Sequence, residues 1–407
     1  MIYIYNFALW LYKIAIRFAA CFNAKARSMY NGWNEAFAKV ESLKNEDVIW
    51  VHAASLGEFE QGRPLMDRIR KFHPEYKILL TFFSPSGYEV RKNYPGADVV
   101  TYLPIDTPKN VDAFISAVRP KKVFFVKYEF WLNYLNTLRK CGVETYIISA
   151  IFREKQVFFA WYGEIFRRAL MAFRCLYLQN NKSEELLQII DINSTKVVGD
   201  TRFDRVADIA AQAKKLPILD AFAKNNDLLV VGSSWQPDEE ILFDYINNMP
   251  EGRKVVIAPH HVEPLRIKLL TDRLTCNYAL YTETNPEAVV NAKCLIINTI
   301  GLLSSIYSYG KVAYVGGGFG VAVHNTLEAA VWGMPVVFGP NFHKFNEIIE
   351  LIACHAATPI NSKIECEAAL DYYFDNPTDA GIAAKNYVMS HIGATDIIYH
   401  DVFGDNS

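Results

Sequence analysis

Two carboxylates stand where short apolar runs end, the place where ligand-binding groups gather in parallel sheets. Glu58 follows the run 47–53 through A-A-S-L-G-E, and Glu129 follows the run 122–128. A carboxylate there can act as a general base. Glu58 could instead complement the dipole at a helix N-terminus, a frequent role of Glu in a first turn. His52, within the first run, is expected to be a hydrogen-bonded core histidine.

A glycine-rich stretch points to phosphate binding. V-G-G-G-F-G at 315–320 leads through His324 and Asn325 to Glu328, and successive glycines let backbone N–H groups approach a phosphate. A dinucleotide fingerprint would stand at the first strand–helix turn of its domain, so NAD is not indicated. The alternative is an ordinary tight turn. G-S-S-W at 232–235 similarly offers hydroxyls to a ligand or caps a helix.

The sequence does not indicate a metal site. His260 and His261 are adjacent and so point in different directions, and no further His or Cys stands at ligand spacing. No D-x-D occurs in the chain, which removes the usual carboxylate pair for holding a divalent cation on a sugar diphosphate. We therefore expect a reaction without metal or cofactor.

The elements that must position these residues alternate in a β-α-β rhythm. Solidly apolar runs of this kind are typical of parallel sheets covered on both faces. The predicted strands are 47–53, 77–83, 98–103, 122–128, 143–149, 174–178, 228–232, 253–258, 278–281, 294–298, 311–316 and 334–338. Two doubly wound α/β domains follow, with the site expected in the cleft between them. We predict an N-terminal segment 1–34, a first domain 35–212, a second domain 213–379, and a C-terminal helix in 380–407 that can pack back on the first domain.

Composition excludes several classes. The chain has 407 residues, 51% of them hydrophobic, with 42 Lys and Arg against 44 Asp and Glu. A chain this apolar is not disordered, and a charge near zero argues against a nucleic-acid binder. Seven scattered Cys without a C-x-x-C pair are typical of reduced thiols in an intracellular protein.

The N-terminus departs from this average. Residues 1–22 are almost wholly apolar, and the first 34 residues carry four positive charges and no acid. Phe7, Trp10, Leu11, Ile14, Phe18, Cys21 and Phe22 share one helical face, which predicts a helix lying in the headgroup region of a membrane. Lys13 interrupts the run after 12 residues, which disfavours a full span. The alternatives are a tilted span and a buried amphipathic helix of the first domain.

Five motifs together resemble one family. They are H-A-A-S-L-G-E (52–58), Y-E-F-W-L-N (128–133), V-G-D-T-R-F-D (198–204), A-P-H-H-V-E (258–263) and the stretch from G-G-G-F to K-F (316–345). In this order, and over nearly the whole chain, they resemble the 3-deoxy-D-manno-octulosonic acid (Kdo) transferases of lipopolysaccharide synthesis. The resemblance implies the GT-B glycosyltransferase fold, with two Rossmann-like domains.

The resemblance also implies roles for individual residues. Glu58 matches the family's catalytic base, Glu129 a residue that assists the transition state, and Arg202 a family Lys. Arg keeps the charge of Lys but not its geometry. His260 replaces a family Arg, Leu302 a Glu and Thr326 a Pro, departures that concern the donor site rather than the base. The implied nucleotide-binding positions are Pro259, His260, Ile300, Gly301, Leu302, Asn325, Thr326, Leu327 and Glu328.

The family's activity would be transfer of Kdo from CMP-Kdo to the lipid A precursor lipid IVA, at the cytoplasmic face of the bacterial inner membrane. The resemblance implies a metal-independent inverting displacement with Glu58 as base. The alternatives are a GT-B glycosyltransferase with another donor, such as a UDP-sugar, a sugar-nucleotide epimerase, which needs no membrane anchor, and an inactive lipid-binding scaffold.

Overall fold

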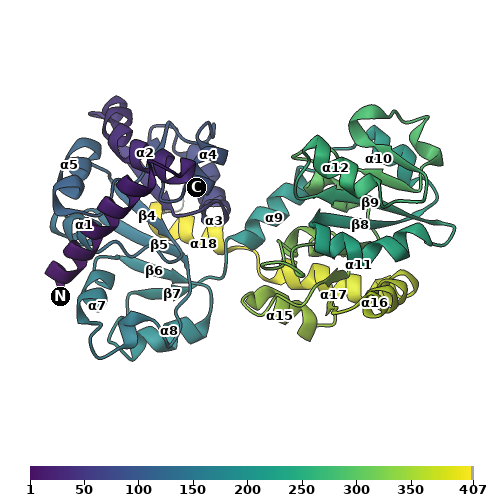
Figure 1. The fold of residues 1–407 in the computed structure, drawn as a ribbon. Coiled ribbons are helices and arrows are strands. Elements are labelled where there is room, and N and C mark those ends of the chain that lie inside the picture. The colour runs from purple at the N-terminus through teal and green to yellow at the C-terminus, as the bar shows by residue number, and fades with distance from the viewer. Residues whose placement is uncertain (405–407) are drawn as a thin grey trace. The chain divides into compact units, whose positions relative to one another are not determined.

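Parallel strands and covering helices organise the chain into two units, shown in a computed structural model that describes residues 1–404 (Figure 1). The first unit consists of Met1–Arg205 with the segment from Ile392 onward, and the second of Val206–His391. Each contains one seven-stranded sheet in which every strand pair is parallel. The predicted fold class, two doubly wound α/β domains, is confirmed.

The first sheet has the order β3-β2-β1-β4-β5-β6-β7. Its strands are β1 (Val48–Ala53), β2 (Lys77–Phe82), β3 (Val99–Tyr102), β4 (Lys122–Val126), β5 (Glu144–Ala150), β6 (Cys175–Leu178) and β7 (Thr195–Val197). The helices of this unit are α1 (Ile2–Ala19), α2 (Ala24–Val40), α3 (Leu56–Phe72), α4 (Pro85–Arg91), α5 (Pro108–Val118), α6 (Leu132–Lys140), α7 (Glu164–Leu170), α8 (Asn181–Gln188) and α18 (Ala394–Phe403), with 3-10 turns η1 (Glu41–Leu43) and η2 (Val157–Phe159).

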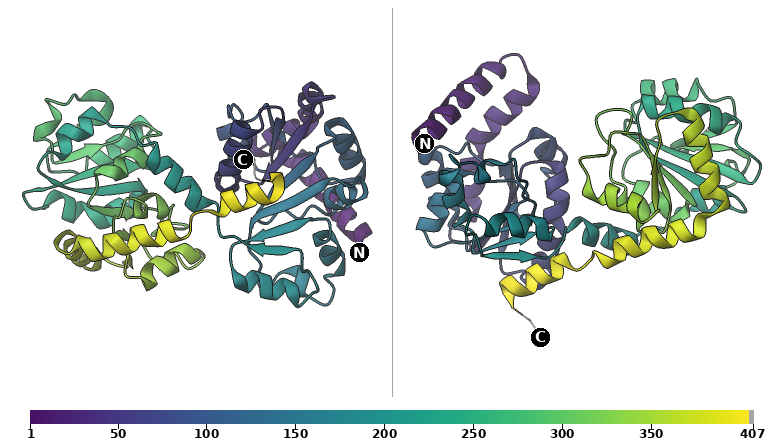
Figure 2. Two further views of the ribbon diagram at one scale, coloured as in Figure 1. Left: turned by 180° about the vertical axis from the view of Figure 1, so that it is seen from behind. Right: turned by 90° about the horizontal axis from the view of Figure 1, so that it is seen from below.

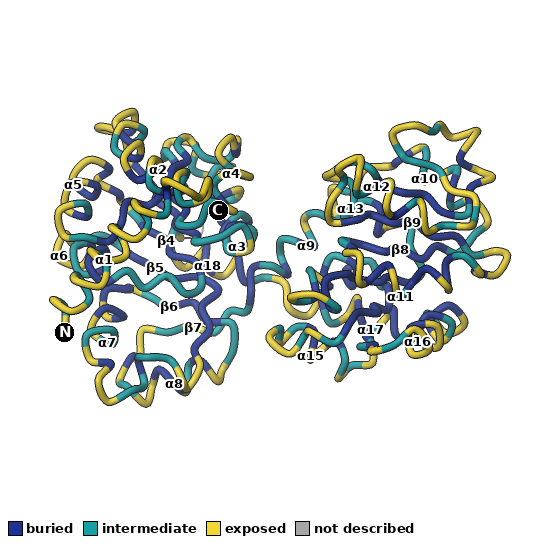
Figure 3. The backbone as a smooth tube through the Cα atoms, in the orientation of Figure 1, coloured by how far each residue is buried: buried dark blue, intermediate teal, exposed yellow. Residues whose placement is uncertain are grey.

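Successive residues of each strand enter different cores because side chains alternate across a sheet. Trp50 and Phe125 belong to the core under α5, α6 and α7, whereas Val51 and Phe124 belong to the core under α3 and α18. Apart from the edge strand β7 and the two edge strands of the second sheet, the strands of both sheets are accordingly buried along most of their length (Figure 3). This two-sided burial explains why the strands read as continuous apolar runs.

The second sheet has the order β10-β11-β9-β8-β12-β13-β14. Its strands are β8 (Asp227–Ser234), β9 (Arg253–Pro259), β10 (Tyr278–Leu280), β11 (Cys294–Ile296), β12 (Val312–Val315), β13 (Val336–Phe338) and β14 (Ala357–Pro359). The helices are α9 (Arg202–Ala211), which begins in the first unit, α10 (Pro217–Ala223), α11 (Gln236–Asn247), α12 (Pro264–Thr271), α13 (Leu303–Ile306), α14 (Leu327–Ala330), α15 (Asn346–Ala353), α16 (Lys363–Asp375) and α17 (Pro377–Ser390), with 3-10 turns η3 (Tyr281–Glu283), η4 (Val289–Asn291) and η5 (Tyr307–Tyr309).

All twelve predicted strands are present within a few residues of their predicted ends. The prediction missed β7 and β14, which have three residues each and lie at sheet edges. Both are only partly buried, so neither forms a solidly apolar run. The predicted strand 122–128 was two residues too long at its carboxyl end. The strand β4 ends at Val126, because the next residue, Lys127, has a left-handed backbone with φ 67°.

The N-terminal helices α1 and α2 form a hairpin on the first unit (Figure 2, right). One side of α1 packs on the unit through Ile2, Tyr5, Leu9 and Ile16. The Tyr5 hydroxyl donates to Asp106 Oδ2 at 2.7 Å, which fixes the helix at its first turn. Within residues 1–404, no helix combines the length and the apolar character that crossing a membrane requires.

Candidate active site

Glu58 lies at the carboxyl end of β1, in the first turn of α3. Its Oε2 accepts hydrogen bonds from the backbone N–H of Ala54, at 2.6 Å, and of Ser55, at 3.1 Å. The side chain thus closes the helix N-terminus, as one of the two interpretations of the sequence anticipated. Burial, and then the negative charge of Glu129, nevertheless raise the pKa of Glu58 to about 7. A carboxylate whose pKa lies near neutral pH is suited to take a proton in a reaction.

Glu129 lies in the loop between β4 and α6, where it contacts a buried histidine. Its Oε2 is 3.0 Å from His52 Nε2 and accepts from Trp131 Nε1 at 2.6 Å. His52 is fully buried, and its Nδ1 is 2.8 Å from Thr81 Oγ1. The sequence correctly predicted a hydrogen-bonded core histidine but missed that its partner is Glu129. The two carboxylates that follow β1 and β4 thus belong to one electrostatic group.

Three residues with a left-handed backbone lie at the same ends of the strands. The backbone angle φ is 67° at Lys127, directly after β4, 51° at Ser149, the second-last residue of β5, and 53° at Ser233, near the end of β8. Residues with a side chain rarely adopt this left-handed conformation, and such strain concentrates at functional sites. These three residues lie at the carboxyl edges of the two sheets, whereas Asn45, Arg119, Asp191, Asn225 and His355, which also have positive φ, lie in loops elsewhere.

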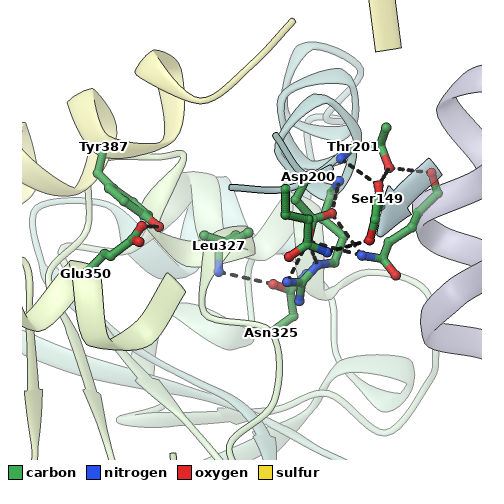
Figure 4. Close-up of polar contacts among 10 residues, drawn as sticks. Ser149, Asp200, Thr201, Asn325, Leu327, Glu350 and Tyr387 are labelled. Atoms are coloured by element: carbon green, nitrogen blue, oxygen red, sulfur yellow. Dashed lines mark hydrogen bonds and ion pairs between the residues drawn. The ribbon is translucent and has the colours of Figure 1, made fainter. Parts of the chain in front are cut away.

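Arg202, at the start of α9, is held by a network that includes the buried Asp200, which Figure 4 shows beside Thr201 and Ser149. Its Nε donates to Asp200 Oδ2 at 2.9 Å, and Asp200 accepts from Gln61 Nε2 at 3.0 Å. Burial alone would raise the pKa of Asp200, but the charge and hydrogen bonds of Arg202 hold it below its ordinary value. Gln61 stands one turn after Glu58 on α3, so a single helix supports both Glu58 and the residues that orient Arg202.

The same network extends to the strained end of β5. Ser149 Oγ is 2.8 Å from Thr201 Oγ1, and the Thr201 hydroxyl also donates to the backbone carbonyl of Gln61 at 2.5 Å. Ser149 and Thr201 are both fully buried. The segment that carries Arg202 is thereby fixed to α3 and β5.

In the second unit, the predicted residues of the segment 325–328 contact one another. Asn325 Oδ1 accepts from the backbone N–H of Leu327 at 3.2 Å, and its Nδ2 donates to Glu328 Oε1 at 3.1 Å (Figure 4 shows the first contact). Glu328 Oε2 also accepts from Ser304 Oγ at 3.2 Å, which ties this segment to α13, the helix that directly follows Ile300, Gly301 and Leu302. Among the described residues, Thr326 Oγ1 is buried without a hydrogen-bond partner.

The glycine-rich loop after β12 is shaped largely by close packing. A Cβ at Gly316 would lie 2.4 Å from the carbonyl oxygen of Ser233, and one at Gly318 would lie 2.6 Å from the backbone of Gly339. The Gly317 N–H donates to the buried Asp238 of α11 at 2.8 Å. Packing against neighbouring backbone therefore accounts for two of these glycines, in line with the tight-turn alternative.

An aromatic cluster at the carboxyl edge of the second sheet was not predicted. Trp235 Nε1 donates to His324 Nε2 at 2.9 Å, and the His260 ring stacks on both, with centroids 4.5 Å from Trp235 and 4.7 Å from His324. Burial, followed by the neighbouring imidazoles His324 and His261, lowers the pKa of His260, and burial lowers that of His324. Trp235, His260 and His324 follow β8, β9 and β12, which are neighbours in the sheet but not all successive in the chain, so the sequence alone did not bring the three rings together.

The part of the chain that the structure describes contains no group of three or more His, Cys, Asp or Glu side chains placed to hold a metal ion. The predicted site residues thus form two constellations. Glu58, Glu129 and Arg202 lie in the first unit or at its edge, and Pro259, His260, Ile300, Gly301, Leu302 and 325–328 lie at the carboxyl edge of the second sheet.

Solved structures share this fold. The chain is similar to the UDP-N-acetylglucosamine 2-epimerase from Neisseria meningitidis bound to UDP-GlcNAc, with a TM-score of 0.57 and 14% identity over 88% of this chain and 100% of that one. A second similar structure is a putative UDP-N-acetylglucosamine 2-epimerase from Listeria monocytogenes, with a TM-score of 0.59 and 13% identity over 88% of this chain and 96% of that one. At such identities the likeness shows the fold, which is of the two-domain GT-B type.

The sequence comparisons relate the chain to one family. Residues 31–205 match the family model of 3-deoxy-D-manno-octulosonic-acid transferase (kdotransferase). The chain is 27% identical to the 3-deoxy-D-manno-octulosonic acid transferase of Aquifex aeolicus over 78% of this chain and 83% of the relative. It is 25% identical to the enzyme of the same name from Chlamydophila psittaci over 87% and 84%. Residues 31–205 are therefore a Kdo transferase family domain, in a chain that resembles these transferases over most of its length.

Proposed function

We propose that the protein is a glycosyltransferase that moves Kdo from CMP-Kdo to lipid IVA. The observation that carries the proposal is the match to the Kdo transferase family across the unit that contains Glu58, Glu129 and the start of α9. The relatives extend the match into the second unit, because they align over 78% and 87% of the chain.

Glu58 is proposed as the general base. Its carboxylate would take the proton from the primary hydroxyl of the acceptor as that oxygen attacks the anomeric carbon of Kdo. CMP would leave from the opposite face, so a single displacement inverts the anomeric configuration and needs no covalent sugar intermediate. The support is the position of Glu58 at a strand end and a pKa of about 7, which lets the group be ionised in the ground state and still accept a proton.

Glu129 and Arg202 are proposed to balance charge as the reaction proceeds. The carboxylate of Glu129 can stabilise positive charge on the reacting sugar, and the guanidinium of Arg202 can face negative charge on the leaving phosphate. Preorganised groups are effective in this role because they need little reorganisation during the reaction. The ring nitrogens around Glu129 and the Asp200–Gln61 network around Arg202 supply that preorganisation.

The donor is proposed to bind at the carboxyl edge of the second sheet. Ligands in open α/β sheets bind at this edge, where Pro259, His260, Ile300, Gly301, Leu302, Asn325, Thr326, Leu327 and Glu328 all lie. No metal or cofactor is part of the proposal.

The exposed face of α1 supports a site of action at the cytoplasmic face of the inner membrane. Tyr3 is 84% exposed, Phe18 70% and Phe22 80%, and Phe7, Trp10, Leu11 and Ile14 are also exposed on this side. The apolar face predicted from the sequence is thus the one that does not pack on the protein. A lipid surface would remove these side chains from water, and an acceptor with acyl chains resides there.

The proposal is tested by incubating the protein with CMP-Kdo and lipid IVA without added metal and weighing the lipid by mass spectrometry. Wild type should add Kdo, Glu58→Gln should add none, and Glu41→Gln, an exposed carboxylate of the same unit, should behave as wild type. Unchanged lipid with wild type would overturn the proposal. Thermal shifts with CMP and UDP would then show whether another nucleotide is the donor product, the case of the alternative glycosyltransferase or epimerase.

A further inference from the structure

A polar pocket lies beside the N-terminal half of α1, outside both constellations described above. Its volume is about 550 Å³, within the usual range for small-molecule sites. Residues of α1, α5, α6 and α7 line it, and its polar groups include Asn6, Asp112, Asn136, Thr137, Lys140 and Arg168. The pocket therefore presents amides, a hydroxyl and charges of both signs to one ligand.

Two of these charges are unpaired although they share the pocket. Asp112 of α5 and Lys140 of α6 are both exposed, and within residues 1–404 neither side chain makes an ion pair or a hydrogen bond. The two charged groups therefore form no ion pair with each other. Arg168, on the α7 side, pairs with Glu164 of its own helix. A ligand that carries both a negative and a positive group would complement this arrangement.

The α1 wall of the pocket is fixed in place. The Asn133 side chain donates to Asn6 Oδ1 at 2.9 Å, and Tyr5 of the same turn donates to Asp106, which also accepts from the backbone N–H groups of Asn133 and Tyr134. Tyr3 and Phe7, which directly follow the pocket-lining Ile2 and Asn6 in the chain, belong to the exposed apolar face of α1. A lipid that lies along that face would bring its headgroup to the side of the helix, where the pocket begins.

We propose that this pocket binds the zwitterionic phosphoethanolamine headgroup of a membrane lipid, with Lys140 and Arg168 facing the phosphate and Asp112 facing the ammonium group. The proposal rests on the membrane part of the proposed function. It adds a lipid-specific contact, in a pocket separate from the candidate active site, to the non-specific burial of apolar side chains.

The test compares vesicles of phosphatidylcholine with vesicles that also contain phosphatidylethanolamine or phosphatidylglycerol, using the full chain in a sedimentation assay. Wild type should bind the phosphatidylethanolamine vesicles more tightly than phosphatidylcholine alone, because a primary ammonium can donate to Asp112 and a quaternary one cannot. Asp112→Asn should remove this difference, and Lys140→Gln should weaken binding by about two- to fivefold, the effect of one exposed ion pair. Lys71→Gln on α3 is the matched control and should change nothing.

A second arm uses soluble phosphoethanolamine, so that the pocket is tested even if the protein binds no vesicle. Backbone and side-chain NMR shifts should respond to phosphoethanolamine in wild type and Lys71→Gln, and in Asp112→Asn and Lys140→Gln the same shifts should need higher phosphoethanolamine concentrations. Inorganic phosphate at the same ionic strength should not reproduce the response. Equal responses in all variants, or an equal effect of inorganic phosphate, would overturn the proposal. If wild type responds to soluble phosphoethanolamine but does not bind vesicles, the result would instead contradict the membrane part of the proposed function.

Discussion

His52 Nε2 lies 3.0 Å from Glu129 Oε2, and this contact joins a fully buried strand residue to a carboxylate in the loop after the neighbouring strand. Trp131 Nε1 completes the group from the other side. Because β1 and β4 are adjacent parallel strands, their carboxyl ends bring Glu129 close enough to Glu58 for its charge to act on that carboxyl. The properties of the proposed base therefore depend on Glu129.

The first prediction concerns this coupling. Glu129→Gln removes a negative charge that helps to raise the pKa of Glu58, so the pKa of Glu58 should fall. The acid limb of the pH dependence of kcat/KM for Kdo transfer should then move to lower pH, whatever happens to the maximal rate. Glu75→Gln, a carboxylate remote from the strand ends on the α3–β2 turn, serves as control. An unshifted limb in Glu129→Gln would show that the two carboxylates are not coupled.

The pKa of about 7 also sets a second expectation for Glu58. The base acts as the carboxylate, so kcat/KM should rise about tenfold per pH unit below pH 7 and level off above it. Glu58→Gln should lose the activity by at least about 100-fold, the lower end of the contribution of a general base. A profile that is flat between pH 5 and 8 would contradict the assignment.

The ionisation of Glu58 that activity requires should lower the stability of the fold. The folded pKa is raised, so the folded state binds the proton more tightly than the unfolded state, and stability is lost as the pH rises from about 4.5 to about 7. Glu58→Gln removes this loss and should be more stable than wild type at pH 8 by about 1–2 kcal/mol, a value discounted for the partial exposure of the side chain. At pH 4 the two proteins should have similar stability. Urea unfolding at both pH values measures the difference.

The Asp200–Arg202 pair gives a prediction about positioning. Asp200→Asn removes the carboxylate that binds the Arg202 guanidinium and should destabilise the protein by about 1–3 kcal/mol. Because Asp200 orients Arg202 without being proposed to touch substrate, kcat should fall more than KM rises. Arg202→Lys, combined with Asp200→Asn, should cost less than the sum of the two single changes, since both remove the same interaction. Additive effects on kcat would show that Asp200 does not act through Arg202.

Much of the fold was predictable because two-sided burial leaves a direct trace in the sequence. Trp50 and Val51 are neighbours in the chain, enter opposite cores and are both apolar. The β14 strand lacks that trace because two of its three residues are only partly buried. The carboxyl end of β4 was predicted wrongly for a different reason. The left-handed conformation at Lys127 ends the strand, and a lysine does not indicate that conformation in the sequence.

The candidate site was predictable only where a residue follows a strand directly, as Glu58 and Glu129 do. Gln61 and Asp200 are 139 positions apart in the sequence, and only the packing of α3 against the start of α9 brings them together. Trp235 and His324 are likewise 89 positions apart. For α1, both sides of the helix carry apolar residues, so periodicity alone could not decide which side packs on the protein.

The outward face of α1 is the basis of a further prediction. Phe7 and Phe18 are 58% and 70% exposed, so replacing both with Ser should leave the melting temperature unchanged. If a membrane buries them, each change should weaken vesicle binding by about 1.5–3 kcal/mol, or at least tenfold. Sedimentation with vesicles measures the loss, and Ile16→Ser, on the side that packs against the protein, should instead lower the melting temperature. Unaltered vesicle binding of the double variant would place the membrane contact elsewhere.

The stacked rings of the second unit provide the last prediction. The Trp235 N–H donates to His324 Nε2, which keeps that nitrogen unprotonated, and burial lowers the pKa of His324 further. Trp235→Phe keeps an aromatic ring but removes the donor, so the pKa of His324 should rise, and NMR titration of the imidazole proton signals can follow it. If the stack shapes the donor site, CMP should stabilise the variant less than it stabilises wild type in a thermal-shift measurement. A variant with a raised His324 pKa and an unchanged response to CMP would show that the stack is structural and lies outside the nucleotide site.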